Sequence, residues 1–162
     1  MTFMEKEKTC AFFGHRNIED KALLFTKILE IIENLIKNQN FAQFLFGGYG
    51  EFDELCHCAV TALREKYPLI KRVFCYSNEK EFCKLKSKGI IKNYEYEDFK
   101  FIPLVYDYWY TRIYFRNCKM VDESDCIIFY VTKNAGSGAY KILQYAQKSK
   151  KEIINVSEME NI

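Results

Sequence analysis

One apolar run constrains the fold of this chain more than any other feature. Between Asp125 and Val131, every residue after the aspartate is apolar or aromatic, so both alternating sets of positions are apolar. A strand with this pattern is buried on both faces, which requires a sheet that helices cover on both sides. The run therefore predicts an inner strand of an α/β sheet.

Other short apolar runs alternate with helical patterns along nearly the whole chain. Strands are also predicted over Thr9–Phe13, Phe41–Phe46, Ile70–Tyr76 and Glu152–Val156. Helices are predicted from Asn17, a residue suited to capping, to about Lys37, and over Asp53–Lys66, Trp109–Glu123 and Tyr140–Lys148. Such alternation implies right-handed crossovers between parallel strands. We therefore predict an α/β fold: a three-layer, Rossmann-like, doubly wound, mainly parallel five-stranded sheet with helices on both faces.

The segment from 77 to 100 is the least informative part of the sequence. It is charged and aromatic, and only Glu79–Lys86 has the pattern of a short helix. A lid, an oligomer contact and plain surface all remain open for it, and Phe101–Val105 fits either a short strand or an extended loop. With 162 residues the chain has the length of a single domain, whose core is expected over about 9–156.

Composition narrows the class of partner and the compartment. The 24 basic and 22 acidic residues give a net charge of +2, too small a charge to favour DNA, RNA or a membrane. No nucleic acid and no membrane partner is therefore expected. The N-terminus soon turns charged, no apolar stretch approaches the roughly 20 residues that span a bilayer, and the seven cysteines lie partly in apolar runs. These features favour a cytoplasmic protein with free thiols.

Three segments that follow predicted strands are candidates for a binding site. They are Gly14-His15-Arg16-Asn17, Gly47–Glu54 and Thr132–Gly138. In a doubly wound sheet, ligands bind beyond the carboxyl ends of the strands. The three segments are therefore expected to converge on one ligand.

The second segment is the strongest candidate. Gly47, Gly48 and Gly50 stand at a strand-to-helix turn, where glycine lets the backbone approach a ligand and the following helix N-terminus attracts phosphate. Asp53 and Glu54 can bind sugar hydroxyls, or act as the catalytic carboxylate if the protein is an enzyme. The alternatives are a tight turn that binds nothing and acids that only stabilise a helix N-terminus.

The other two segments complete the candidate ligand-binding set. Gly14-His15-Arg16 offers an imidazole and a cation, and the alternative is that these are ordinary surface residues. Gly136-Ser137-Gly138 forms a second glycine turn before a helix, which suits phosphate. The alternative there is a loop followed by a helix start.

Two further clusters are assigned no ligand. Cys56-His57-Cys58 has residue types that bind metals, but helix residues two apart point to different sides, so no metal site and no cofactor are predicted. An aromatic cluster follows the fourth strand candidate, and core or oligomer packing is favoured over base stacking for it. Its members are Tyr106, Tyr108, Trp109, Tyr110 and Tyr114.

Taken together, the motifs resemble a known superfamily. Gly14-His15-Arg16, the segment from Gly47 to Asp53, and Arg116-Asn117 followed by Met120 and Ser124-Asp125 are similar to a group of uncharacterised bacterial proteins. That group resembles the SLOG superfamily of Rossmann-like domains, which includes the Lonely Guy phosphoribohydrolases and the DNA-processing protein DprA. The resemblance covers about residues 9–156. It implies a bacterial protein that binds a nucleotide or a nucleotide-derived signal.

The resemblance also implies a ligand role for Arg116 and Asn117. The alternative for Arg116 is a solvated stripe with Arg112 and Lys119, which lie at helical spacing. The alternative for Asn117 is a hydrogen bond to the backbone at the sheet edge.

Comparison with the Lonely Guy enzymes leaves one carboxylate unassigned. Those enzymes carry Arg-Lys-x-x-Met and then a glycine loop followed by a glutamate. Here Arg116 and Met120 match, whereas Ile142 stands where the glutamate belongs. Asp53 or Glu54 can substitute, since a negative charge beside the glycosidic bond stabilises an oxocarbenium-like sugar.

The sequence therefore predicts a small cytoplasmic SLOG-type domain. Its expected partner is a phosphate-bearing, nucleotide-derived small molecule at the carboxyl ends of the strands. One alternative is a nucleotide N-glycosidase of the phosphoribohydrolase kind that uses Asp53 or Glu54. A second alternative is a protein-interaction or assembly module, and a homo-oligomer is considered as well.

Overall fold

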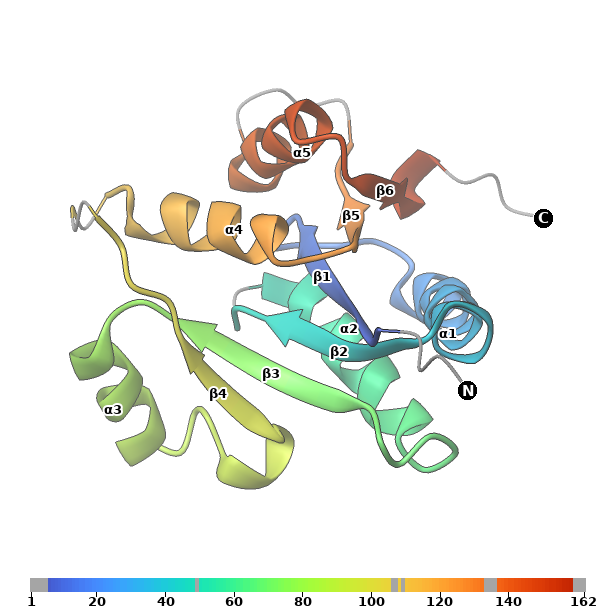
Figure 1. The fold of residues 1–162 in the computed structure, drawn as a ribbon, viewed down its shortest axis with the longest axis horizontal. Coiled ribbons are helices and arrows are strands. Elements are labelled where there is room, and N and C mark those ends of the chain that lie inside the picture. The colour runs from blue at the N-terminus through green and yellow to red at the C-terminus, as the bar shows by residue number, and fades with distance from the viewer. Residues whose placement is uncertain (1–5, 49, 106–107, 109, 133–136, 159–162) are drawn as a thin grey trace.

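Six strands form one parallel sheet at the centre of the molecule (Figure 1). The computed structural model describes residues 6–48, 50–105, 108, 110–132 and 137–158. The strands are β1 (Lys8–Gly14), β2 (Phe41–Phe46), β3 (Lys71–Tyr76), β4 (Asp98–Phe101), β5 (Cys126–Tyr130) and β6 (Glu152–Asn155). They lie in the order β4-β3-β2-β1-β5-β6, and every neighbouring pair is parallel.

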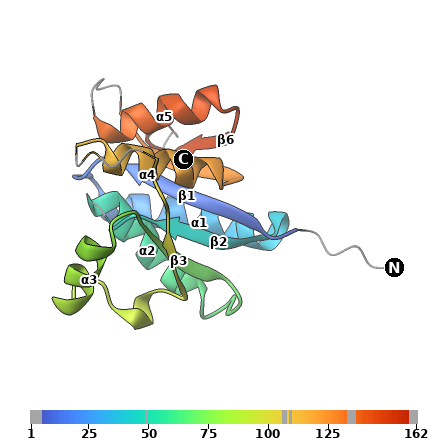
Figure 2. The same ribbon diagram turned by 60° about the vertical axis from the view of Figure 1, so that its left-hand side comes forward.

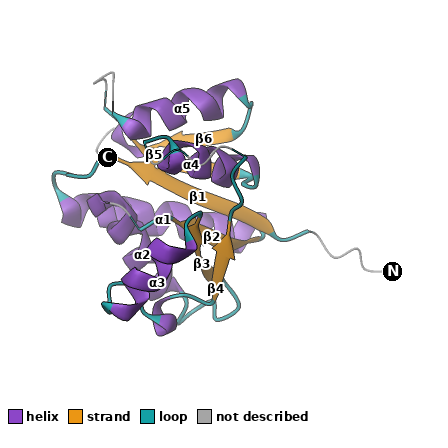
Figure 3. Ribbon diagram, turned by 90° about the vertical axis from the view of Figure 1, so that its left-hand side faces the viewer, coloured by secondary structure: helices purple, strands orange, loops and turns teal. Residues whose placement is uncertain are grey.

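Helices cover both faces of this sheet. One face carries α1 (Lys21–Gln39), α2 (Gly50–Leu63) and, toward the β4 edge, α3 (Glu79–Ser87) (Figure 2). The other face carries α4 (Arg112–Asp122) and α5 (Gly138–Lys148) (Figure 3). Two short 3-10 turns, η1 (Asn93–Glu95) and η2 (Val156–Glu158), precede β4 and follow β6. The predicted three-layer, Rossmann-like α/β fold is confirmed.

Alternate residues of the strands build two cores, one beneath each helical layer. Beneath α1 and α2, Phe12 of β1 stacks on Phe46 of β2 with ring centroids 5.1 Å apart. Ile128 of β5 belongs to the same core, whereas its neighbours Ile127 and Phe129 pack in the core beneath α4 and α5. The continuous apolar run of β5 thus serves both faces, as its sequence indicates.

The sheet has one strand more than predicted. The additional strand, β4, pairs with β3 at the edge of the sheet, with Phe74 opposite Phe99. It overlaps the predicted short strand only at Phe101. Charged and aromatic residues alternate along it and none of them is fully buried, so it lacks the continuous apolar run that marks an inner strand.

The helices α1, α2, α4 and α5 begin within three residues of their predicted starts but not at them. The cap assigned to Asn17 is wrong, because α1 begins at Lys21 and Asp20 stands at its N-cap position. Ile18 explains the difference: its side chain is buried, and its N–H donates to Oε2 of Glu51 at 2.7 Å, which holds this stretch as a loop against α2. That second helix begins at Gly50, three residues before the predicted start.

Within the described part of the chain, none of the helices combines the length and apolarity needed to cross a membrane.

Candidate ligand-binding site

The point where the strand order reverses lies between β1 and β5, and His15 joins the two strands there. Gly14 ends β1 opposite Tyr130 of β5, and the His15 N–H donates to the Tyr130 carbonyl at 3.2 Å. The Thr132 N–H donates to Nε2 of the His15 ring at 2.9 Å. Because a backbone amide can only donate, Nε2 is the unprotonated ring nitrogen in this arrangement. His15 therefore fixes the first residues beyond β5.

A carboxylate of the protein itself is hydrogen-bonded to the glycine loop after β2. Asp53, from the first turn of α2, turns back and accepts hydrogen bonds from the N–H of Gly47 at 3.4 Å and of Gly48 at 3.1 Å. These are two of the amides for which the sequence suggested phosphate contacts. The carboxylate of Asp53 thus occupies the position that an anion would take on this loop.

Arg116 reaches the same loop from α4 on the other side. Its side chain is buried, and Nη1 donates to the Gly47 carbonyl at 3.2 Å, while Nε and Nη2 donate to Oδ1 of Asn117 at 3.2 and 2.9 Å. A Cβ on Gly47 would overlap Nη2 of Arg116, so a larger residue there would displace the end of this guanidinium. The solvated-stripe alternative for Arg116 is wrong, and Asn117 bonds this guanidinium.

Asp53 has an unusual protonation equilibrium for a carboxyl group. Burial raises its pKa from the ordinary 3.8 to about 7, although the hydrogen bond from Gly47 and the charge of Arg116 pull it down. The pKa of a carboxyl group rises this far when burial removes the charged form from water and nearby hydrogen bonds and cations offset only part of that cost. Asp53 is therefore a group that titrates near neutral pH at the centre of the candidate site.

The start of α2 is docked on the loop after β1. The N–H of Glu51 donates to the Arg16 carbonyl at 2.9 Å, and Oε1 of Glu51 pairs with Lys21 at 2.8 Å. Gly50 adopts φ +90°, and a Cβ there would lie 2.9 Å from Cα of Arg16. Gly50 therefore makes the close packing of two site segments possible, whatever the ligand.

The start of α5 supplies the third segment. Ser137 is its N-cap, and Oγ accepts from the N–H of Tyr140 at 3.1 Å. Gly138, the first helical residue, is exposed, with open space where a Cβ would stand. The first turn of a helix has N–H groups without an intrahelical partner, and Ser137 caps one of them. Gly136 lies outside the described residues.

Two cavities meet at the Gly47 wall. The switch-point pocket, of about 350 Å³, is lined by residues that include Gly14, His15, Arg16, Asn117, Ser137 and Gly138. The aromatic cavity, of about 480 Å³, is lined by residues that include Gly48, Glu54, Phe74, Tyr76, Phe82 and Tyr96. Gly47, Asp53, Ile113 and Arg116 line both. The predicted site residues that the structure describes thus gather around one wall, with Gly50 packed just behind it.

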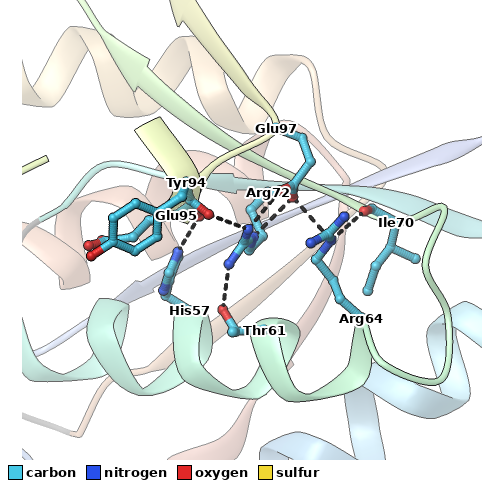
Figure 4. A network of polar contacts seen from close by, with 8 residues as sticks. All are labelled: His57, Thr61, Arg64, Ile70, Arg72, Tyr94, Glu95 and Glu97. Atoms are coloured by element: carbon cyan, nitrogen blue, oxygen red, sulfur yellow. Dashed lines mark hydrogen bonds and ion pairs between the residues drawn. The ribbon is translucent and has the colours of Figure 1, made fainter. Parts of the chain in front are cut away.

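The aromatic cavity was not predicted, and its outer wall depends on a buried arginine. Arg72 of β3 donates to Glu97 through Nε at 2.9 Å and Nη2 at 2.6 Å, and Nη2 also donates to the Tyr94 carbonyl at 3.1 Å (Figure 4). His57 of α2 bonds the Glu95 carbonyl at 2.8 Å through Nε2. These contacts fix η1 and place Tyr96. The signal in the sequence was Arg72, a charged residue within the predicted strand Ile70–Tyr76.

The remaining candidate residues lie at the rim of the aromatic cavity or away from both cavities. Glu54 is exposed at the aromatic cavity, whereas both oxygens of Asp53 are engaged. Cys56 is buried and Cys58 exposed, on different sides of α2. Of the aromatic cluster, the three tyrosines that the structure describes are exposed, so they do not pack in the core; these are Tyr108, Tyr110 and Tyr114. Tyr106 and Trp109 lie outside the described residues.

Comparison of the sequence with protein-family models and with curated proteins finds no match. Among solved structures, TM1055, a structural-genomics target, aligns over 93% of this chain and 78% of its own, with a TM-score of 0.58 and 14% identity. DNA processing protein A from Helicobacter pylori aligns over 90% of this chain, with a TM-score of 0.53 and 18% identity. This chain spans 63% of that structure. These likenesses show a shared fold, the one that the SLOG resemblance implies.

The comparison overturns one expectation. The sequence predicted no nucleic-acid partner from its net charge of +2. Yet the structure of DNA processing protein A, which shares this fold, concerns a single-stranded DNA binding mode. Net charge sums the whole surface and does not report how cations gather at one place. Here Arg16 and Arg116 line the switch-point pocket together with a single carboxylate, Asp53. The exclusion of nucleic acid was therefore wrong.

Proposed function

We propose that this protein is a SLOG-type domain that binds a nucleotide or a nucleotide-derived molecule. The phosphate of the ligand would occupy the switch-point pocket. One observation carries the proposal: a cationic pocket and an aromatic cavity meet at the same edge of the sheet and share one wall. The shared fold with TM1055 and DNA processing protein A supports the fold assignment on which it rests.

The charges of the pocket favour an anion. Arg16 is exposed at its edge, and its side chain has no hydrogen bond or ion pair to any residue that the structure describes. The first residues of α5 line the same pocket through Gly138, preceded by the N-cap Ser137. A helix N-terminus and an arginine that converge on one space provide both N–H donors and positive charge for phosphate. Asp53 holds the glycine loop between them.

Titration calorimetry with ribose 5-phosphate and with nucleoside monophosphates tests the proposal. Arg16→Gln removes the charge at the pocket, and Lys148→Gln removes the same charge at the exposed far end of α5. We expect Arg16→Gln to weaken binding about tenfold or more, because a hydrogen bond to a charged group is worth about 1.5–3 kcal/mol. Lys148→Gln should bind as the unmodified protein does. Failure of every phosphate-bearing probe at millimolar concentration, or equal affinities of the two variants, would refute the proposal.

Single-stranded nucleic acid is the second candidate, favoured by the single-stranded DNA binding mode of DNA processing protein A. A short oligonucleotide in the same titration separates the two candidates. A nucleic-acid site gains affinity with strand length, and its binding constant falls steeply with salt because counterions are released from the backbone. A site for a free nucleotide prefers the mononucleotide and shows a shallow salt dependence.

A further inference from the structure

The aromatic cavity is distinct in chemistry from the switch-point pocket. Its lining includes four acidic residues, Asp53, Glu54, Glu81 and Glu95, against two arginines, Arg112 and Arg116. The switch-point pocket has the opposite balance, with one acid and two arginines. A phosphate is therefore disfavoured in the aromatic cavity and favoured in the switch-point pocket. The aromatic cavity suits an uncharged, largely apolar group.

Its aromatic residues form a continuous set of rings. Tyr76 and Phe82 stack with centroids 3.9 Å apart and planes inclined by only 8°. Phe74 lies 5.9 Å from Phe82 and 5.3 Å from Tyr96, the latter edge-on. A planar aromatic ligand finds both ring faces and ring edges in such a set, which are the two preferred geometries of aromatic contact.

Within this set Tyr76 is the ring best placed to receive a ligand. Phe82 has Tyr76 on one side, and the ammonium group of Lys86 lies over its ring at 5.3 Å from the centroid. Phe82 is thus engaged by both neighbours and stacks on one face of Tyr76, whose ring also meets the tilted ring of Phe101 at 5.6 Å between centroids. Tyr76 is half-buried at the carboxyl end of β3, where it lines the cavity.

Hydrogen bonds from β3 and α2 also hold the cavity in shape. Arg72 and His57 bond the carbonyls of Tyr94 and Glu95, so the segment that carries Tyr96 is fixed to β3 and α2 (Figure 4). Tyr94 itself points away and is 74% exposed. A wall built by buried hydrogen bonds is in place before a ligand arrives, which reduces the ordering cost of binding.

From these observations we infer that the aromatic cavity binds the nucleobase of the ligand, with Tyr76 as its stacking platform. The inference rests on the proposed function, since it gives the second half of the ligand its place. The base would lie across the Gly47–Arg116 wall from the phosphate. The inference therefore defines the ligand class: a planar aromatic group and a phosphate that are joined by a short linker such as a ribose.

Calorimetry on the unmodified protein gives the first test, with AMP, GMP, CMP and UMP compared against ribose 5-phosphate. At least one monophosphate should bind roughly 5- to 150-fold more tightly than ribose 5-phosphate, the factor that corresponds to base stacking of about 1–3 kcal/mol. Tyr76→Leu should remove most of that difference, whereas Tyr76→Phe keeps the ring and should preserve it. Tyr94→Leu, which removes an exposed ring that does not line the cavity, is the matched control and should change nothing.

The outcomes separate this inference from the proposed function. Equal affinity for ribose 5-phosphate and all four monophosphates overturns the inference and leaves the phosphate pocket standing. Binding of adenosine with no binding of ribose 5-phosphate supports the aromatic cavity and overturns the phosphate pocket. No binding of any probe overturns both. A base preference that survives Tyr76→Leu shows that the base lies elsewhere, which also overturns the inference.

Discussion

Replacement of Asp53 by asparagine tests the electrostatics at the centre of the site. In the folded protein the Asp53 carboxyl is buried, with its pKa raised from 3.8 to about 7. The folded state therefore holds this proton over a pH range in which the unfolded chain has released it. Stability contributed by Asp53 is full below pH 3.8, falls as pH rises, and is lost at about pH 7 and above.

The size of this effect follows from the shift. One proton of difference between the two states corresponds to about 1.4 kcal/mol of unfolding free energy per pH unit. Between pH 5 and pH 8 the unmodified protein should thus lose about 2–3 kcal/mol through Asp53. Asparagine resembles the protonated acid: one oxygen still accepts from the glycine loop, and no charge is buried. Asp53→Asn should therefore match the unmodified protein within about 1 kcal/mol at pH 5 and exceed it at pH 8.

Urea unfolding at intervals from pH 5 to pH 8 measures the two curves. Other titrating groups tilt both curves alike, so the difference between them isolates Asp53. Gly138→Ala, which alters no ionisable group, serves as the control and should run parallel to the unmodified protein. If the Asp53→Asn curve also runs parallel, the raised pKa of Asp53 and the burial argument behind it are refuted.

Three further substitutions test the local packing by urea unfolding at fixed pH. Gly47→Ala should destabilise by about 1–3 kcal/mol, because its Cβ overlaps the Arg116 guanidinium; an unchanged unfolding midpoint would contradict that contact. Gly138→Ala should stabilise by about 0.5–1 kcal/mol, because it adds a helix former where the structure leaves open space; destabilisation would show that the space is filled. Arg72→Met should cost about 1–3 kcal/mol, because Glu97 loses the guanidinium bonds and keeps only its ion pair with Arg64 at 3.3 Å and the backbone N–H of position 72 at 2.8 Å; adding Glu97→Gln should restore part of it, and a loss below about 1 kcal/mol would count against the network.

The sequence specified the inner strands well because burial on both faces leaves a local signal. Phe41–Phe46 was predicted with the bounds that β2 has, and the apolar run after Asp125 became β5. Strand β4 was missed because an edge strand shows alternating charged and apolar residues. Asn17 was chosen as a cap from local residue types, its own and that of Asp20 three residues later, whereas the anchoring of Ile18 by Glu51 decides where α1 begins.

The candidate site was predictable as a place and not as a set of contacts. Strand ends converge by topology, so the three loop segments could be assigned to one edge of the sheet. Asp53 accepts hydrogen bonds from the loop amides, and Arg116 donates to the Gly47 carbonyl. Each of these bonds joins a side chain to the backbone of another part of the chain, which no local sequence pattern encodes. The aromatic cavity was missed for the same reason. Its rings come from β3, from α3 and from the segment before β4, and the sequence assigned no role to the segment from 77 to 100.

The wall shared by the two cavities has a consequence for which molecules can compete at this site. Gly47, Asp53, Ile113 and Arg116 line both spaces, and the proposed ligand would fill both. Two fragments that fill the spaces separately each lose translational and rotational freedom, whereas a joined ligand loses it once. Once one half is bound, the other is held at an effective concentration set by the linker, which for short flexible linkers is in the millimolar range. Free phosphate and free nucleosides should therefore be weak competitors against a molecule that carries both groups.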